Sequence, residues 1–111
     1  MIEIFVETLQ QVYVVKLAGE IDAGSAITVQ QKVLPMSVPG CQIILDLTQV
    51  AYMSSAGLRM LLSVYRQISG NQGRIVLVGL SDELKDTMSM TGFLGYFTVQ
   101  DTLETGLQAF I

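Results

Sequence analysis

Two adjacent serines, Ser54 and Ser55, have the clearest capacity for chemistry in this sequence. They stand in the segment DLTQVAYMSSAGLRMLL, with an apolar run on each side, and Ala56 and Gly57 follow directly. A serine hydroxyl can act as a nucleophile, accept a phosphoryl group or cap a helix. Which use applies depends on the bases and ligands that the rest of the chain supplies.

The sequence contains no histidine, so a catalytic serine has no evident base. Imidazole zinc ligands and the commonest general base at neutral pH are absent for the same reason. There is no GxSxG motif, no GxxxxGK[ST] phosphate loop and no Cys-x-x-Cys pair. The sequence therefore predicts a protein that is not an enzyme and uses no metal or cofactor, although the paired serines leave a small serine-based enzyme open as an alternative.

Length and composition predict one domain over residues 1–111. Half of the residues are apolar, yet every apolar run is far shorter than the roughly 20 residues that a membrane-spanning helix needs. The N-terminal MIEIFVETLQ carries glutamates where a signal peptide would carry basic residues, and Cys41 is the single cysteine. We therefore expect a cytoplasmic protein without membrane insertion.

The net charge of −4 argues against direct binding to nucleic acid, which relies on lysine and arginine. Any role in transcription would have to act through other proteins.

The first half of the chain alternates strand and helix patterns. IEIFVET and VYVVKLAG predict a β-hairpin over residues 2–18. A helical stripe predicts a helix over residues 25–34 that Pro35 ends, and CQIILDL has the continuous apolar character of a central strand. A second helix is expected over residues 56–69, with Gly70 as its left-handed C-terminal cap.

The second half continues the alternation. RIVLVGL predicts a buried strand, Ser81 begins a helix that Gly92 stops, and YFTV predicts a short strand. Asp101 and Glu104 have capping-box spacing before a last helix. The order ββαβαβαβα predicts an α/β fold with about four helices and a mostly parallel mixed sheet, in which the hairpin forms an antiparallel edge.

Two polar junctions follow strands in this scheme. Asp22 comes between a strand and the first helix, and Ser54 and Ser55 come between the central strand and the second helix. Loops at the carboxyl ends of parallel strands converge on one edge of a sheet. We therefore expect both junctions to lie on the same side of the molecule.

Three segments together carry a family resemblance: LAGEIDAGSA, IILDLTQVAYMSSAGLRMLL and VLVGLSDELKDTMSMTGF. They resemble the successive motifs of anti-sigma factor antagonists, which are single-domain members of the sulfate-transporter and anti-sigma-antagonist (STAS) domain family. The resemblance covers nearly the whole chain. It implies that the unphosphorylated protein binds an anti-sigma factor with serine kinase activity and that phosphorylation releases it. It further implies a serine phosphatase as a partner, and a monomer or weak dimer.

By position, the resemblance makes Ser55 the phosphorylated serine and Asp22 the acid of the family's Glu-Leu/Ile-Asp motif. Ser54 stands where many regulated members have aspartate, a difference that bears on kinase recognition. The partner-binding set that the resemblance implies also includes Gly57 and Leu58.

Arg59, four residues after Ser55, can share a helix face with it and either meet the partner, pair with a phosphate or simply be solvated.

Purely structural roles stay open for several of these residues. Either serine, and equally Asp22, can be an N-cap. Gly57 in a first helical turn indicates close approach by another backbone, because glycine weakens a helix. A scaffold subunit of the same fold that is never phosphorylated, in a signalling or transport complex, is the alternative function. The methionines, among them Met53, Met60, Met88 and Met90, are expected in the core, with an exposed subset suited to binding.

Overall fold

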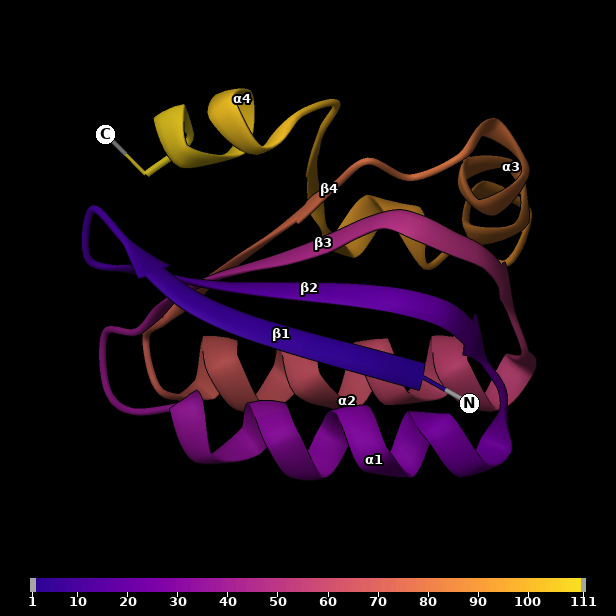
Figure 1. Cartoon of the computed structure of the whole chain (residues 1–111), viewed down its shortest axis with the longest axis horizontal. Helices are drawn as coiled ribbons and strands as arrows, with labels where there is room; N and C mark the ends of the chain where they lie inside the picture. Colours follow the sequence, from indigo (N-terminus) through magenta and orange to yellow (C-terminus); the bar gives the residue numbers. More distant parts are fainter. Residues whose placement is uncertain (1, 111) are drawn as a thin grey trace.

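The structure is a computed structural model that describes residues 2–110. Its elements follow the predicted order ββαβαβαβα (Figure 1). The strands are β1 (Ile2–Leu9), β2 (Val12–Ile21), β3 (Gln42–Met53), β4 (Arg74–Val78) and β5 (Thr98–Gln100). The helices are α1 (Ala23–Val33), α2 (Ser55–Gly70), α3 (Asp82–Met90) and α4 (Leu103–Gln108), with 3₁₀ turns at Leu34–Met36 and Leu94–Tyr96.

The five strands form one sheet in the spatial order β1-β2-β3-β4-β5. β1 pairs antiparallel with β2, and all other neighbours are parallel. The hairpin turns through Gln10 and Gln11, whose φ angles of 52° and 67° are the two positive values that a tight primed turn requires. The predicted mixed sheet with an antiparallel edge is thereby confirmed.

The two faces of the sheet are covered unequally. α1 and α2 lie side by side along one face, whereas α4 lies over one end of the opposite face (Figure 1). The larger core cluster joins side chains such as Leu17 and Leu45 to Val29 of α1 and Leu61 of α2, and Leu84 and Met88 of α3 extend it. A smaller cluster on the α4 side is built from Val12, Val14, Ile44, Val76 and Val78.

The region after α2 differs from the sequence prediction. Gly70 is the last residue of α2 and not a left-handed cap; Gln72 instead has the positive φ, at 61°. The glycine that this turn needs is Gly73, where an added Cβ would lie 2.5 Å from the Cys41 sulfur and 2.9 Å from the Cys41 carbonyl oxygen. Close approach to Cys41 therefore decides where the glycine stands, and Gln72 takes the left-handed conformation.

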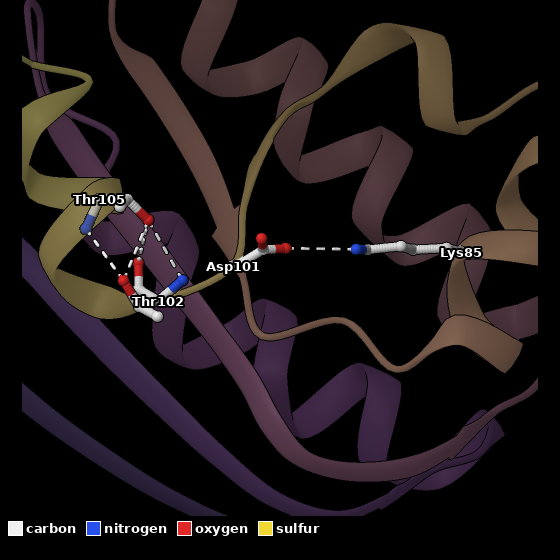
Figure 2. Close-up of polar contacts among 4 residues, drawn as sticks. All are labelled: Lys85, Asp101, Thr102 and Thr105. Carbon is white, nitrogen blue, oxygen red and sulfur yellow. Dashed lines mark hydrogen bonds and ion pairs between the residues drawn. The ribbon is translucent and has the colours of Figure 1, made fainter.

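The start of α4 is a second correction. Its capping box is formed by Thr102 and Thr105, not by Asp101 and Glu104 (Figure 2). The Thr105 N–H donates to Thr102 Oγ1 at 3.1 Å, and the Thr102 N–H donates to Thr105 Oγ1 at 3.2 Å. Asp101 instead forms an ion pair with Lys85 of α3, with 3.4 Å between Asp101 Oδ1 and Lys85 Nζ. Because α4 begins one residue later than expected, the box moves by one position.

Other predicted boundaries are close. α1 begins at Ala23, two residues earlier than predicted, and Pro35 falls in the 3₁₀ turn that follows it. Ser81 caps α3 by accepting from the Leu84 N–H at 3.1 Å, and Gly92 ends that region with a φ of 81°. β5 covers Thr98–Gln100, because Tyr96 belongs to the preceding 3₁₀ turn.

Candidate functional site

The structure brings the two polar junctions together. In the parallel pair β2–β3, Ile21 lies opposite Met53. The next residues, Asp22 and Ser54, therefore leave the sheet side by side, and the Ser54 N–H donates to the Ile21 carbonyl oxygen at 2.8 Å. The expectation that both junctions share one side of the molecule is confirmed. The starts of α1 and α2 are held together by this contact.

Asp22 is the N-cap of α1. Its Oδ1 accepts from the Ser25 N–H at 2.9 Å and from the Ser25 hydroxyl at 3.0 Å. The same hydroxyl accepts from the Asp22 N–H at 2.8 Å, and its single proton is shared between Asp22 Oδ1 and the Glu20 carbonyl oxygen, which lies at 2.8 Å. These hydrogen bonds from Ser25 lower the pKa of the Asp22 carboxyl, which is therefore an exposed and fixed carboxylate near neutral pH.

The two serines have different positions. Ser54 is the N-cap of α2, and its hydroxyl accepts from the Gly57 N–H at 3.3 Å. Ser55 is the first helical residue and is exposed. The capping role thus falls on Ser54. The Ser55 hydroxyl stands at the positive end of a helix of 16 residues.

Gly57 and Leu58 face the protein interior. A Cβ on Gly57 would lie 2.5 Å from Met53 Cγ, 2.9 Å from Ile21 Cγ2 and 3.1 Å from the Ile21 carbonyl oxygen. The close approach predicted at this glycine is therefore made by the chain's own β2. The Leu58 side chain is only 5% exposed and belongs to the core, so both residues support the site from beneath.

A shallow groove continues from the serines along the two helices. It runs between α1 and α2 and is lined by Ala23, Ala26, Ile27, Gln30, Ala56, Arg59, Met60 and Ser63. Arg59 is exposed at its rim and also borders a second hollow with Arg66 on the outer side of α2. Across the groove, Gln30 Nε2 donates to Ser63 Oγ at 3.2 Å.

Ile27 is the residue that sequence reasoning missed. It is 58% exposed beside Ala56 and Arg59, although it is a large apolar side chain. The helical stripe of Ala26, Val29 and Val33 faces the core, and Ile27 stands one position off that stripe. That displacement was a detectable signal, because an isoleucine outside the buried stripe has no core role.

The methionines singled out in the sequence differ in their exposure to solvent. Met53, Met60 and Met88 are buried, as expected of core residues, whereas Met90 is 87% exposed at the end of α3. Cys41 is buried, and burial raises the pKa of its thiol.

Residues 2–110 contain no cluster of three histidine, cysteine, aspartate or glutamate side chains that could hold a metal ion. Within the same residues, no helix has the length and apolar character needed to cross a membrane.

Comparison with known proteins gives a consistent result. Residues 3–106 match the STAS domain. The anti-sigma-B factor antagonist of Bacillus subtilis is 30% identical over 94 residues, which is 85% of this chain and 86% of that protein. The anti-sigma-B factor antagonist of Listeria monocytogenes is 38% identical over 77 residues, 68% of each chain. The match to a relative from Bordetella bronchiseptica is shorter and covers 60% of that relative.

Among solved structures, an anti-sigma factor antagonist from Mycobacterium paratuberculosis superposes with a TM-score of 0.84 at 28% identity. The superposition covers 98% of this chain and 93% of that one. The likeness therefore extends over the whole sheet and its helices, including the start of α2.

Proposed function

The chain belongs to the STAS domain family, and we propose that it is an anti-sigma factor antagonist switched by phosphorylation of Ser55. In its unphosphorylated form it binds an anti-sigma factor that is also a serine kinase, and so frees a sigma factor. Phosphorylation by that kinase ends the binding, and a serine phosphatase restores it. The exchange takes place in the cytoplasm without contact to DNA. The protein is a ligand and a substrate, and the kinase supplies ATP and the catalytic groups.

This proposal depends on one observation, namely that Ser54 and Ser55 have different structural roles. Ser54 is occupied as the N-cap of α2, while Ser55 is exposed in the first turn. A kinase can reach the Ser55 hydroxyl without breaking the cap. The neighbouring groove between α1 and α2 gives a partner an apolar surface directly beside it.

The fold tolerates a phosphate at this position. A phosphoryl group adds about −1.5 to −2 charges, and the N-terminus of a helix favours an anion by roughly 0.3–1 kcal/mol. Ser55 is exposed, so the added group displaces no core side chain. Phosphorylation should therefore leave the free protein folded.

Release then arises at the interface. A dianion that enters a contact fitted to a small hydroxyl is desolvated or meets like charge, which costs several kcal/mol. About 3–4 kcal/mol suffices to turn a tight complex into a negligible one, since each 1.4 kcal/mol is tenfold in affinity.

Arg59 contributes to the switch in this proposal. It lies one helical turn from Ser55 and lines the groove, so its guanidinium can meet an acidic group of the partner. Once Ser55 carries a phosphate, the same guanidinium can pair with it. Asp22, fixed by Ser25, adds a carboxylate on the other side of the groove.

Phosphopeptide mapping tests the acceptor. The protein is incubated with ATP and the serine kinase anti-sigma factor from the same host, and Ser54→Ala and Ser55→Ala serve as a matched pair. We expect Ser55→Ala to abolish phosphorylation at unchanged stability. Ser54→Ala should still be phosphorylated while losing about 1 kcal/mol of stability with its cap. Modification confined to Ser54 would overturn the assignment, and no modification at all would favour the scaffold role.

Calorimetry with the same anti-sigma factor tests the switch. Ser55→Asp should bind at least about 100-fold more weakly than wild type, in line with a loss of roughly 3 kcal/mol. Ser55→Ala should bind normally and stay bound in the presence of ATP. If Ser55→Asp binds as tightly as wild type, or if phosphorylation unfolds α2, the proposed mechanism is wrong.

A further inference from the structure

The sheet face opposite α1 and α2 is only partly covered. α4 packs over one end of it (Figure 1), on Ile44, Val76 and Val78. Beyond that end, the same face of β1 and β2 continues with Phe5, which is 57% exposed and lies opposite Lys16. A large aromatic side chain is thus presented on an open half of the sheet.

This open half is hollowed. A pocket there is lined by Phe5, Lys16, Leu17 and Ala18 of the hairpin and by Asp46, Thr48 and Gln49 of β3. The hollow follows a register shift in the β2–β3 pair between Lys16 and Ala18. Such a bulge bends a strand and re-aims its side chains. The Asp46 carboxylate is fixed at the rim, because it accepts from the Thr48 N–H at 3.0 Å and from the Thr48 hydroxyl.

The charges of this region are mostly negative. Successive side chains of a strand point to opposite faces, so Glu3 and Glu7 share the face of Phe5. Glu20 is exposed and lies opposite Tyr52, which is 53% exposed, while the next pair, Ile21 and Met53, is buried beneath the helices.

Lys16 is the basic residue of this region, and Glu7 already pairs with it at 3.2 Å. Among residues 2–110, the carboxylates of Glu3, Glu20 and Asp46 form no ion pair.

We propose that this open face binds a cationic, amphipathic segment of another protein. The open face is defined as Glu3, Phe5, Glu7, Lys16, Ala18, Glu20, Asp46, Thr48, Gln49 and Tyr52. Its negative charge repels nucleic acid and anionic lipid, so a protein surface is the matching occupant. Phe5 and Tyr52 supply aromatic anchors, and the carboxylates receive lysine or arginine around them.

This surface lies on the other side of the sheet from the groove between α1 and α2. Tyr52 faces the open side, and Met53, its neighbour in β3, faces the helices. A partner seated in the hollow beside Phe5 therefore lies on the other side of the sheet from the groove beside Ser55. The inference does not depend on the proposed function, and the two can fail separately.

A defined probe tests the inference. A synthetic peptide of leucine and lysine, patterned as an amphipathic helix of roughly four turns, is titrated into the ¹⁵N-labelled full chain. We expect the largest amide shift changes on the open-face residues of β1, β2 and β3, with an affinity that weakens as salt rises. Changes centred instead on Asp82, Glu83 and Asp86 of α3, an acidic cluster without that hollow, would overturn the proposal. Absence of binding, or equal binding of a leucine–glutamate peptide, would overturn it as well.

Matched variants sharpen the test. Phe5→Ser should weaken the peptide at least about tenfold, as expected for loss of an aromatic anchor. Ile27→Ser, at nearly the same exposure on the helix side, should leave the affinity unchanged. Phe5 lies in the edge strand β1, so its replacement could also disturb the pairing of that strand. A second variant, Glu3→Gln with Glu20→Gln, therefore changes charge alone. It should weaken binding of the peptide and reduce the dependence of the affinity on salt. Ser55→Asp should bind the peptide as wild type does. If neither the Phe5 nor the glutamate variant changes the affinity, the open face is not the binding surface.

Discussion

The helices α1 and α2 and the open face carry opposite charge. On the helix side, α1 and α2 contain Lys32, Arg59 and Arg66, and one carboxylate, the N-cap Asp22, stands before α1. The open face on the other side carries Glu3, Glu7, Glu20 and Asp46 against Lys16. The chain as a whole has a net charge of −4, so the basic helix layer is the exception to its average.

This difference shows how one sheet can present two unlike surfaces. Adjacent residues of a strand point to opposite faces, so Lys16 and Leu17 belong to different surfaces although they are neighbours in sequence. The helix side combines an exposed serine with nearby guanidinium groups, which suits a partner with acidic groups. The open face combines carboxylates with exposed aromatic rings, which suits a basic one. The net charge of the whole chain indicates neither the basic surface nor the acidic one.

A glycine on each side tests how tightly the two layers are packed. Gly57→Ala should destabilise the protein by about 1–3 kcal/mol, because the new Cβ would clash with Met53 and Ile21, including the Ile21 carbonyl at 3.1 Å. In Gly106→Ala, the new Cβ of α4 would clash with Val78 Cγ1 at 2.5 Å and meet Ile44 Cδ1 at 3.4 Å. We expect a smaller loss there, since the short α4 lies at the surface and can shift. Urea unfolding of both variants gives the two values.

Gly70→Ala is the control for the helix-propensity effect. Nothing lies within 4 Å of an added Cβ at Gly70, so alanine there should stabilise α2 by roughly 0.5–1 kcal/mol. Equal losses of stability for the Gly57 and Gly106 variants would mean that α4 is packed as rigidly as α2, contrary to this expectation.

The attachment of α4 can be tested at its N-terminus. Thr102→Val removes the cap hydroxyl and should cost about 1 kcal/mol. Asp101→Asn removes the charge of the ion pair with Lys85, whose partners are 35% and 85% exposed, and should change stability by less than about 0.5 kcal/mol. Thermal unfolding of the two variants compares them. A larger effect at Asp101 than at Thr102 would restore the capping role that sequence spacing suggested.

Asp22 should give the smallest effect, and it depends on pH. The hydrogen bonds from Ser25 lower the pKa of Asp22 below its usual value in the folded state, so its charge stabilises the fold at neutral pH and the benefit is lost as pH falls through the folded pKa. Asp22→Asn keeps a good N-cap but removes the charge. The wild type should therefore melt above this variant at pH 7, and the difference should shrink below about pH 4. A difference that is constant from pH 7 to pH 3 would assign the effect to hydrogen bonding alone.

Much of the architecture could be predicted from the sequence because it depends on local patterns. Apolar alternation and helical stripes predicted the order ββαβαβαβα, and the small polar residues at 54 and 55 predicted a helix start. The resemblance then pointed to Ser55, and the convergence of parallel strand ends correctly predicted that Asp22 and Ser54 lie together.

Tertiary contacts decided the features that local sequence patterns do not specify. Which serine caps α2 depends on where the chain leaves β3, and that point is fixed by the hydrogen bond from Ser54 to Ile21. Gly57 is required by the proximity of β2, and Gly73 by the proximity of Cys41, although neither neighbour is near in sequence. The acidic open face arises only when β1, β2 and β3 are aligned in register, because a local pattern specifies which residues share a face of one strand but not which strands lie beside it.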